Sequence, residues 1–208
     1  MEYLSLIGTV TLIHLLAVMS PGPDFIVAVQ NSISYSRKAG IWTAVGFGLG
    51  VIVHIFYSIA GLAIVISQSI VLFNVIKLMG AAYLVYIGVK SMTSKSEEID
   101  IEEGLEKKQI SSFEAIKMGF LTNVLNPKVT LFFLSLFTMV ISPDTPMSIL
   151  TILSLIIIMN TILWFSLLAI FFTQKKVRNI YHKFEGVFNK TFGGLLVGLG
   201  ITVAFSQK

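Results

Sequence analysis

The sequence has little charge and no cysteine. Charged residues make up 12% of its 208 residues, about half of the roughly 25% that is usual in soluble domains. Hydrophobic residues make up 55%, and the mean hydropathy is +0.86. A surface this apolar would aggregate in water, so the composition indicates that lipid surrounds the chain. The missing cysteines exclude disulfides, thiol redox chemistry and cysteine-bound metals.

Long uncharged runs fill most of the chain. Because about 20 apolar residues cross the hydrocarbon core as a helix, each run is long enough to span a membrane. The runs are continuous instead of alternating, which excludes a β-barrel and leaves no room for a soluble domain. The sequence therefore predicts one all-α transmembrane domain over residues 1–208. Its six expected helices lie at about residues 4–31, 40–67, 70–92, 113–142, 147–174 and 187–206.

The basic residues flank these runs. The net charge of +4 and the pI near 9.3 predict no nucleic-acid partner, because the basic residues form no groove and are better explained as topology signals. They gather in three alternate loops, whereas the intervening loops are almost bare, so both termini are expected outside the cell. The first basic residue is Arg37, which argues against a cleavable signal peptide. The loop residues are Arg37, Lys38, Lys90, Lys95, Lys107, Lys108, Lys175, Lys176, Arg178, Lys183 and Lys190.

The two halves of the chain resemble each other. A Lys-x-x-Gly pattern occurs at Lys77–Gly80 in the third helix and at Lys190–Gly193 in the sixth, and prolines interrupt the first and fourth helices. The Lys-x-x-Gly match alone is weak in a chain with 16 glycines, but the paired interruptions favour a repeat. Three helices per half give the halves opposite orientations, as in many secondary transporters. The predicted parts are repeat one at 1–92, a cytoplasmic linker at 93–112 and repeat two at 113–208.

The first interruption reads Ser20-Pro21-Gly22-Pro23-Asp24. Proline lacks an N–H group and disfavours helix in the residue before it, so the helix is expected to break and to leave carbonyl groups free. Such backbone is tolerated at membrane depth only inside protein or beside a wet cavity. Asp24 opens the second half-helix, where the positive end of the helix dipole favours a carboxylate.

The second interruption contains Asn123, Asn126, Pro127 and Lys128. Pro127 removes the helical donor of the Asn123 carbonyl, and Asn126 is placed to cap the new half-helix. A lysine near the membrane centre costs about 3 kcal/mol unless it is paired or hydrated, so Lys128 is a functional candidate.

These groups suit a zwitterionic amino acid. Asp24 and the freed carbonyls would hold its ammonium group, while Lys128 and the half-helix N–H groups would hold its carboxylate. The alternative is a static salt bridge between Asp24 and Lys128, and the two arrangements are compatible as different states of one cycle. The expected substrate-binding residues are Ser20, Pro21, Gly22, Pro23, Asp24, Asn123, Asn126, Pro127, Lys128 and Asn160.

Three further polar positions are ambiguous. His54 lies in the middle of the second helix, where it either relays protons or packs as a hydrogen-bonded histidine. Asn160 and Trp164 share a face of the fifth helix and either line the pathway or join helices. His14 alone carries little signal. Small-residue faces on helices two, three and six leave a homo-oligomer open.

Several of these motifs resemble the LysE/RhtB family of amino-acid exporters. They are Ser-Pro-Gly-Pro-Asp at 20–24, Arg-Lys-Ala-Gly at 37–40, Gly-Phe-Gly-Leu-Gly at 46–50, Gly-Ala-Ala-Tyr-Leu at 80–84, Gly-Val-Lys at 88–90 and Gly-Phe-Leu-Thr-Asn-Val-Leu-Asn-Pro-Lys at 119–128. The resemblance implies efflux of amino acids such as threonine, homoserine, lysine or leucine, driven by an ion gradient across the plasma membrane of a prokaryote. It is closer to the homoserine/threonine type. We expect proton antiport, with Asp24 and His54 as the proton-coupling residues.

Two rival classes fit the residues less well. A metal or other small-ion exporter usually needs membrane histidine, cysteine or acidic clusters, and this chain offers isolated His14 and His54 with one deep acid. An intramembrane enzyme would need a motif such as H-E-x-x-H or G-x-S-x-G, and neither occurs. The sequence therefore predicts a transporter without catalytic residues, cofactor or metal site, whose partners are the amino-acid substrate and the bilayer.

Overall fold

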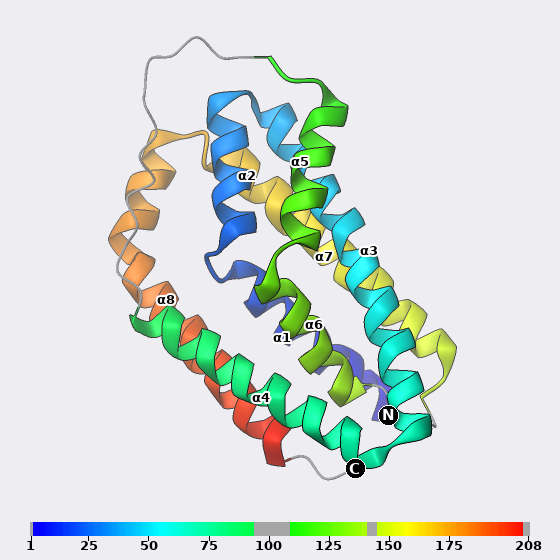
Figure 1. The fold of residues 1–208 in the computed structure, drawn as a ribbon. Coiled ribbons are helices and arrows are strands. Elements are labelled where there is room, and N and C mark those ends of the chain that lie inside the picture. Colours follow the sequence, from blue (N-terminus) through cyan, green and yellow to red (C-terminus); the bar gives the residue numbers. More distant parts are fainter. Residues whose placement is uncertain (1, 94–108, 141–144, 206–208) are drawn as a thin grey trace.

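The computed structural model describes residues 2–93, 109–140 and 145–205. Within these ranges it holds eight helices and no strand, as expected for an all-α protein (Figure 1). The helices are α1 (Glu2–Met19), α2 (Pro23–Ser34), α3 (Arg37–Gln68), α4 (Ile70–Thr93), α5 (Ser112–Val124), α6 (Pro127–Val140), α7 (Met147–Phe171) and α8 (Lys175–Phe205).

Four helices are long and apolar enough to cross a membrane, within α3, α4, α7 and α8. The pairs α1–α2 and α5–α6 pass the same test only when each pair is taken together, and each pair is bent by 60°. The described residues therefore hold four to six candidate spans. Large apolar side chains on α7 remain exposed at every fourth residue, as on a surface that faces lipid. They are Leu155, Met159, Leu163, Leu167 and Phe171.

The last helix is longer than the sequence predicted. The expected start was near residue 187, but α8 begins at Lys175. The charged stretch at its start was interpreted as a loop. It contains no proline, and its lysine, arginine and glutamate residues are good helix formers, so the helix continues through it. The predicted linker falls partly on 94–108, which lie outside the described residues.

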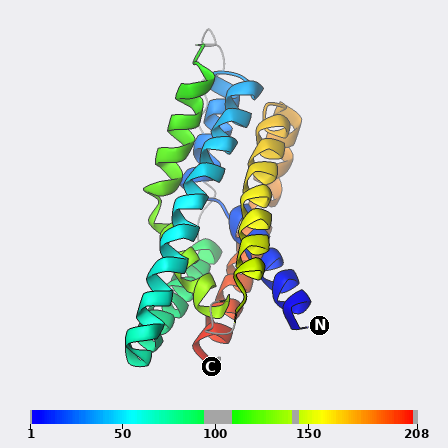
Figure 2. The same cartoon turned by 90° about the vertical axis from the view of Figure 1, so that its right-hand side faces the viewer.

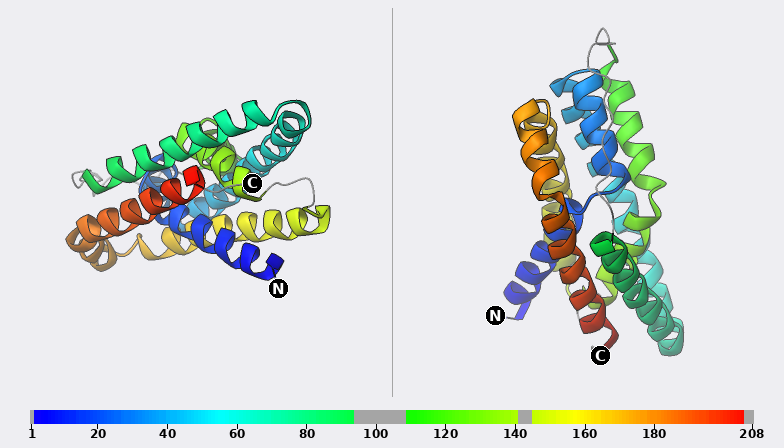
Figure 3. Two further views of the ribbon diagram at one scale, coloured as in Figure 1. Left: turned by 90° about the horizontal axis from the view of Figure 1, so that it is seen from below. Right: turned by 90° about the vertical axis from the view of Figure 1, so that its left-hand side faces the viewer.

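Helix α3 lies at the centre of the packing. It contacts α5 on one side and α7 on another, while α4 and α8 run antiparallel side by side (Figures 1 and 3). The start of α1 and the end of α8 lie at one end of the molecule (Figure 2). The turns between α2 and α3 and between α7 and α8 lie at the other end, where Arg37 Nε donates to Thr173 Oγ1 at 2.8 Å.

Glycines allow the closest helix contacts. A Cβ atom on Gly88 of α4 would lie 2.6 Å from the carbonyl oxygen of Gly193 on α8. A Cβ atom on Gly119 of α5 would collide with the carbonyl oxygen of Thr43 on α3. Small residues at such contacts let helix backbones approach closely, which is how helices associate in lipid.

Candidate functional site

The first helix break follows from its two prolines. Helix α1 ends at Met19, and α2 begins at Pro23, whose fixed φ and missing N–H suit the first helical position. The first helical bond of α2 runs from the N–H of Ile26 to the carbonyl of Gly22 at 3.0 Å. The preceding carbonyls of Ser20 and Pro21 therefore remain available to side chains from elsewhere.

The second break lies between α5 and α6. Asn126 precedes Pro127, and its Oδ1 accepts from the backbone N–H of Lys128 at 3.0 Å, which caps α6. The carbonyl of Asn123, which loses its helical donor to Pro127, accepts from the N–H of Asn126 at 3.0 Å. The same carbonyl accepts from His54 Nε2 at 3.0 Å. The Asn123 carbonyl at the end of α5 and the Lys128 N–H at the start of α6, which the break leaves without helical partners, are therefore both hydrogen-bonded.

The carboxylate of Asp24 is buried and binds the second break. Asn123 Nδ2 donates to its Oδ2 at 2.6 Å, and Asn126 Nδ2 donates to its Oδ1 at 2.9 Å. Asp24 is 7% exposed, and a carboxylate so buried needs such donors. Asn126 uses both ends of its amide: the oxygen caps α6, and the nitrogen holds Asp24.

The ammonium group of Lys128 binds the first break. Its Nζ donates to the carbonyl of Ser20 at 2.9 Å, to Ser20 Oγ at 3.1 Å and to the carbonyl of Pro21 at 3.1 Å. Three acceptors match the three hydrogens of an ammonium group. Carbonyls at the end of α1 also favour a cation, because the C-terminal end of a helix is negative.

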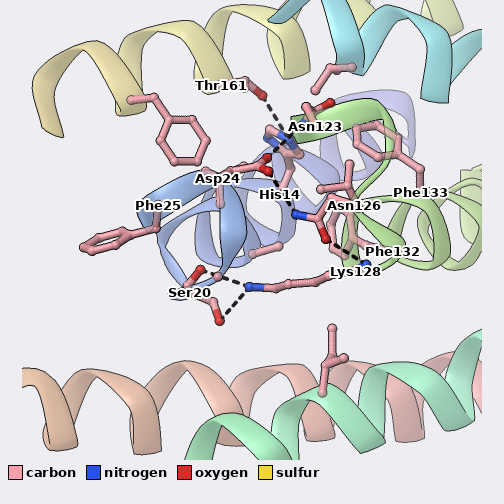
Figure 4. A pocket seen from close by; sticks show the side chains of 17 residues that line it. His14, Ser20, Asp24, Phe25, Asn123, Asn126, Lys128, Phe132, Phe133 and Thr161 are labelled. Atoms are coloured by element: carbon pink, nitrogen blue, oxygen red, sulfur yellow. Dashed lines mark hydrogen bonds between the residues drawn. The ribbon is translucent and has the colours of Figure 1, made fainter. Parts of the chain in front are cut away.

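The charged residue of each break thus hydrogen-bonds to groups of the other break. The acid of the first break is held by amides of the second, and the cation of the second is held by oxygens of the first (Figure 4). In these contacts Asp24 and Lys128 hydrogen-bond to the opposite break and not to each other. The static salt bridge considered from the sequence is therefore not the arrangement of this conformation.

His54 lies behind Asn123. Its Nε2 faces a carbonyl that only accepts, so Nε2 carries a hydrogen, and its Nδ1 lies 2.6 Å from the hydroxyl oxygen of Tyr57. The ring stacks on Phe133 with centroids 5.6 Å apart. These contacts connect the middle of α3 to the second break.

A cavity of about 50 Å³ lies between the breaks, which is room for water molecules. One part of its lining is polar and the rest is mostly aromatic and aliphatic (Figure 4). The polar residues are His14, Ser20, Asp24, Asn123, Asn126, Lys128 and Thr161. The apolar side chains include Val51, Ile87, Phe132, Phe133 and Phe165.

The structure brings most of the expected site residues together. Ser20, Gly22, Asp24, Asn123, Asn126 and Lys128 line the cavity. The prolines at 21, 23 and 127 form the breaks themselves. Asn160 is not among the lining residues, and its buried Nδ2 has no partner among the described residues.

Sequence reasoning missed His14 and Thr161, which line the cavity from α1 and α7. His14 precedes the first break by less than two helical turns, and this position is the one signal that was available for it. The described residues contain no group of three or more His, Cys, Asp or Glu side chains able to hold a metal ion.

Several apolar helices around a buried, charged site between two helix breaks are the features of a membrane transporter. The chain matches the LysE type translocator family over residues 15–207 and belongs to that family. It is therefore a membrane translocator, and its membership of this family supports an export function.

Relatives match almost the whole chain. It is 35% identical over 198 residues to the uncharacterised membrane protein YrhP of Bacillus subtilis, covering 91% of this chain and 93% of that protein. It is 28% identical to the threonine efflux protein of Escherichia coli K12, over 98% of this chain and 100% of that protein. The threonine efflux protein of Salmonella typhimurium is also 28% identical, over 96% of this chain and 97% of that protein. No solved structure matches the chain significantly.

Proposed function

We propose that this protein exports an amino acid or a close derivative across the plasma membrane, in exchange for protons. The substrate belongs to the class that includes threonine, homoserine, lysine and leucine. The observation that carries the proposal is the exchange of charges between the breaks, with Asp24 on the amides of Asn123 and Asn126 and Lys128 on the oxygens of Ser20 and Pro21.

In this conformation the protein's own groups occupy the positions that a zwitterion needs. The ammonium of Lys128 sits on the oxygens of Ser20 and Pro21, where the ammonium of a substrate would bind beside Asp24. When the substrate enters, Lys128 leaves these oxygens and turns to the substrate carboxylate. The cavity must widen for this exchange, since about 50 Å³ holds water and not an amino acid. This widening is the alternating-access step of the proposal.

Proton coupling uses the same acid. Deprotonated Asp24 holds the substrate ammonium, and protonated Asp24 releases it. The proton and the amino acid therefore use Asp24 in turn, which couples export of the amino acid to entry of the proton. His54, whose Nε2 donates to the backbone carbonyl of Asn123, is the second proton-coupling residue of the proposal. Binding at such helix breaks, with rocking of two repeats around them, is common among secondary transporters.

The architecture of the proposal has six spans in two inverted repeats. Repeat one contains α1–α2, α3 and α4, and repeat two contains α5–α6, α7 and α8. Both termini lie outside in a prokaryotic plasma membrane. The basic residues near the turns opposite the start of α1 support this orientation, since cytoplasmic loops are rich in lysine and arginine. They are Arg37, Lys38, Lys175, Lys176 and Arg178.

The threonine efflux proteins among the relatives support a threonine-like substrate. The test is efflux of radiolabelled amino acids from proteoliposomes, with and without an imposed proton gradient. We expect gradient-dependent movement of one or a few amino acids, and its collapse in Asp24→Asn while the protein remains folded. The proposal fails if the folded protein moves no amino acid, or if both Asp24→Asn and Lys128→Gln transport at the original rate.

A further inference from the structure

The cavity has a second polar end that the proposed binding of a zwitterion does not use. His14 of α1 and Thr161 of α7 are both 1% exposed, and both line the cavity. Figure 4 places them on one side of Asp24, with Ser20 and Lys128 on the other side. A substrate whose ammonium lies at Asp24 and whose carboxylate reaches Lys128 would therefore extend its side chain toward His14.

The hydrogen-bond pattern defines which group His14 offers. The hydroxyl of Thr161 donates its hydrogen to the carbonyl of Ile157 at 3.0 Å. Its oxygen is then an acceptor, and His14 Nε2 lies 3.5 Å away, a long contact in which Nε2 is the donor. This assigns the hydrogen of the ring to Nε2 and leaves Nδ1 as an acceptor. Nδ1 is buried and has no partner in the part of the chain that the structure describes.

The surroundings of this acceptor are aromatic. The ring of His14 lies 6.1 Å from that of Phe132 and 6.0 Å from that of Phe133, measured between centroids. A buried acceptor in such a wall lowers stability until a donor reaches it. Asp24 is the one acid among the described residues of the lining, so this end offers no negative charge to balance a second ammonium group.

We propose that His14, positioned by Thr161, is a specificity-determining residue that binds a hydroxyl group on the side chain of the substrate. The inference rests on the proposed export of an amino acid and narrows its class to hydroxyamino acids. A hydroxyl donates to Nδ1. A leucine side chain leaves Nδ1 without a partner, and a lysine side chain would bring an ammonium group to an end of the cavity that has no carboxylate to balance its charge.

The test compares threonine with valine, which has the same shape but a methyl group in place of the hydroxyl. Transport of both is measured in proteoliposomes for the original protein, His14→Leu, Thr161→Val and Thr161→Ser. Sites that hydrogen-bond a substrate hydroxyl strongly reject the analogue that lacks it, so the original protein should prefer threonine by about tenfold or more. His14→Leu should bring the ratio close to one, Thr161→Val should lower it, and Thr161→Ser should restore it.

The matched control is Thr138→Val, which removes the hydroxyl of another buried threonine that does not line the cavity. It should keep the original ratio. Equal transport of threonine and valine by the original protein would overturn the inference. An unchanged ratio in Thr161→Val would also overturn it. Valine has nearly the shape of threonine, so this variant keeps the fold and tests the inference even if His14→Leu does not fold. Either result leaves amino-acid export standing. Movement of neither substrate also overturns the inference, and the proposed function falls with it only if the folded protein moves no amino acid of the radiolabelled panel.

Discussion

The ammonium group of Lys128 lies 2.9 Å from the carbonyl oxygen of Ser20, a residue 108 positions earlier in the chain. The contact joins the start of α6 to the end of α1, and Ser20 Oγ and the Pro21 carbonyl complete it. Because Asp24 makes the converse contacts with Asn123 and Asn126 of the second break, the two breaks hold each other in place through five side chains. A change in one break must therefore alter the geometry of the other.

Replacing Lys128 by methionine should lower transport by about 10- to 100-fold, because the substrate carboxylate loses its cationic partner and a hydrogen bond to a charged group contributes about 1.5–3 kcal/mol. Radiolabelled amino-acid exchange in proteoliposomes measures the effect. Lys90→Met is the matched control, since Lys90 is exposed at the last turn of α4. Exchange by Lys128→Met at more than half of the original rate would contradict the role given to this cation.

Gly50→Ala should disturb Asp24 without touching it. A Cβ atom on Gly50 would lie 2.5 Å from Oδ1 and 2.9 Å from Cβ of Asn123, so the Asn123 side chain must move away from Asp24. Loss of that hydrogen bond to a carboxylate should reduce transport about tenfold or more. Gly61→Ala on the same helix is the control, because nothing lies within 4 Å of its added Cβ. Equal transport by the two variants would show that the Asn123–Asp24 bond is dispensable.

The sequence predicted several candidate site residues because local rules act on them. Asp24, Asn126 and Lys128 stand beside prolines, and Asn123 loses the helical donor of its carbonyl to Pro127. An uncompensated break or charge in an apolar run is visible without a structure. The exchange of partners between the breaks was not visible, since it depends on how α1–α2 and α5–α6 lie against each other. The local rules left a direct Asp24–Lys128 salt bridge equally open.

His14 and Thr161 were missed for a related reason. They are 147 residues apart, and each alone looks like an ordinary packing residue in an apolar helix. Only the packing of α1 on α7 brings them to one cavity. The opposite error occurred at the start of α8, where charge suggested a loop although helix propensity favoured the helix that begins at Lys175.

Gly88→Ala should destabilise the contact between α4 and α8. The added Cβ would lie 2.6 Å from the Gly193 carbonyl oxygen and 2.9 Å from the backbone nitrogen of Val197, and backbone atoms cannot move aside easily. Such overpacking costs about 1–3 kcal/mol, which should appear as a lower thermal midpoint in detergent. Gly194→Ala on α8 is the control, because nothing lies within 4 Å of its added Cβ. A Gly88→Ala midpoint equal to that of Gly194→Ala would contradict the close contact.

His54 offers a test that separates support of the fold from proton coupling. His54→Phe keeps a ring that stacks on Phe133 but removes the donor to the Asn123 carbonyl, so stability should fall by about 1 kcal/mol or more. His54→Gln keeps an amide donor for that carbonyl and should retain most of the stability. It does not carry a titratable proton, so gradient-driven efflux should fall several-fold while amino-acid exchange without a gradient continues.

Thermal unfolding in detergent and the two transport modes in proteoliposomes measure these outcomes for both variants. Ser58→Ala provides the control, since Ser58 is buried on the same helix but its hydroxyl has no hydrogen-bond partner among the described residues. If His54→Gln drives efflux from the gradient at the original rate, His54 carries no proton, and its role is to hold the Asn123 carbonyl. Asp24 would then be the coupling group by itself, because it is the one carboxylic acid among the described residues that line the cavity.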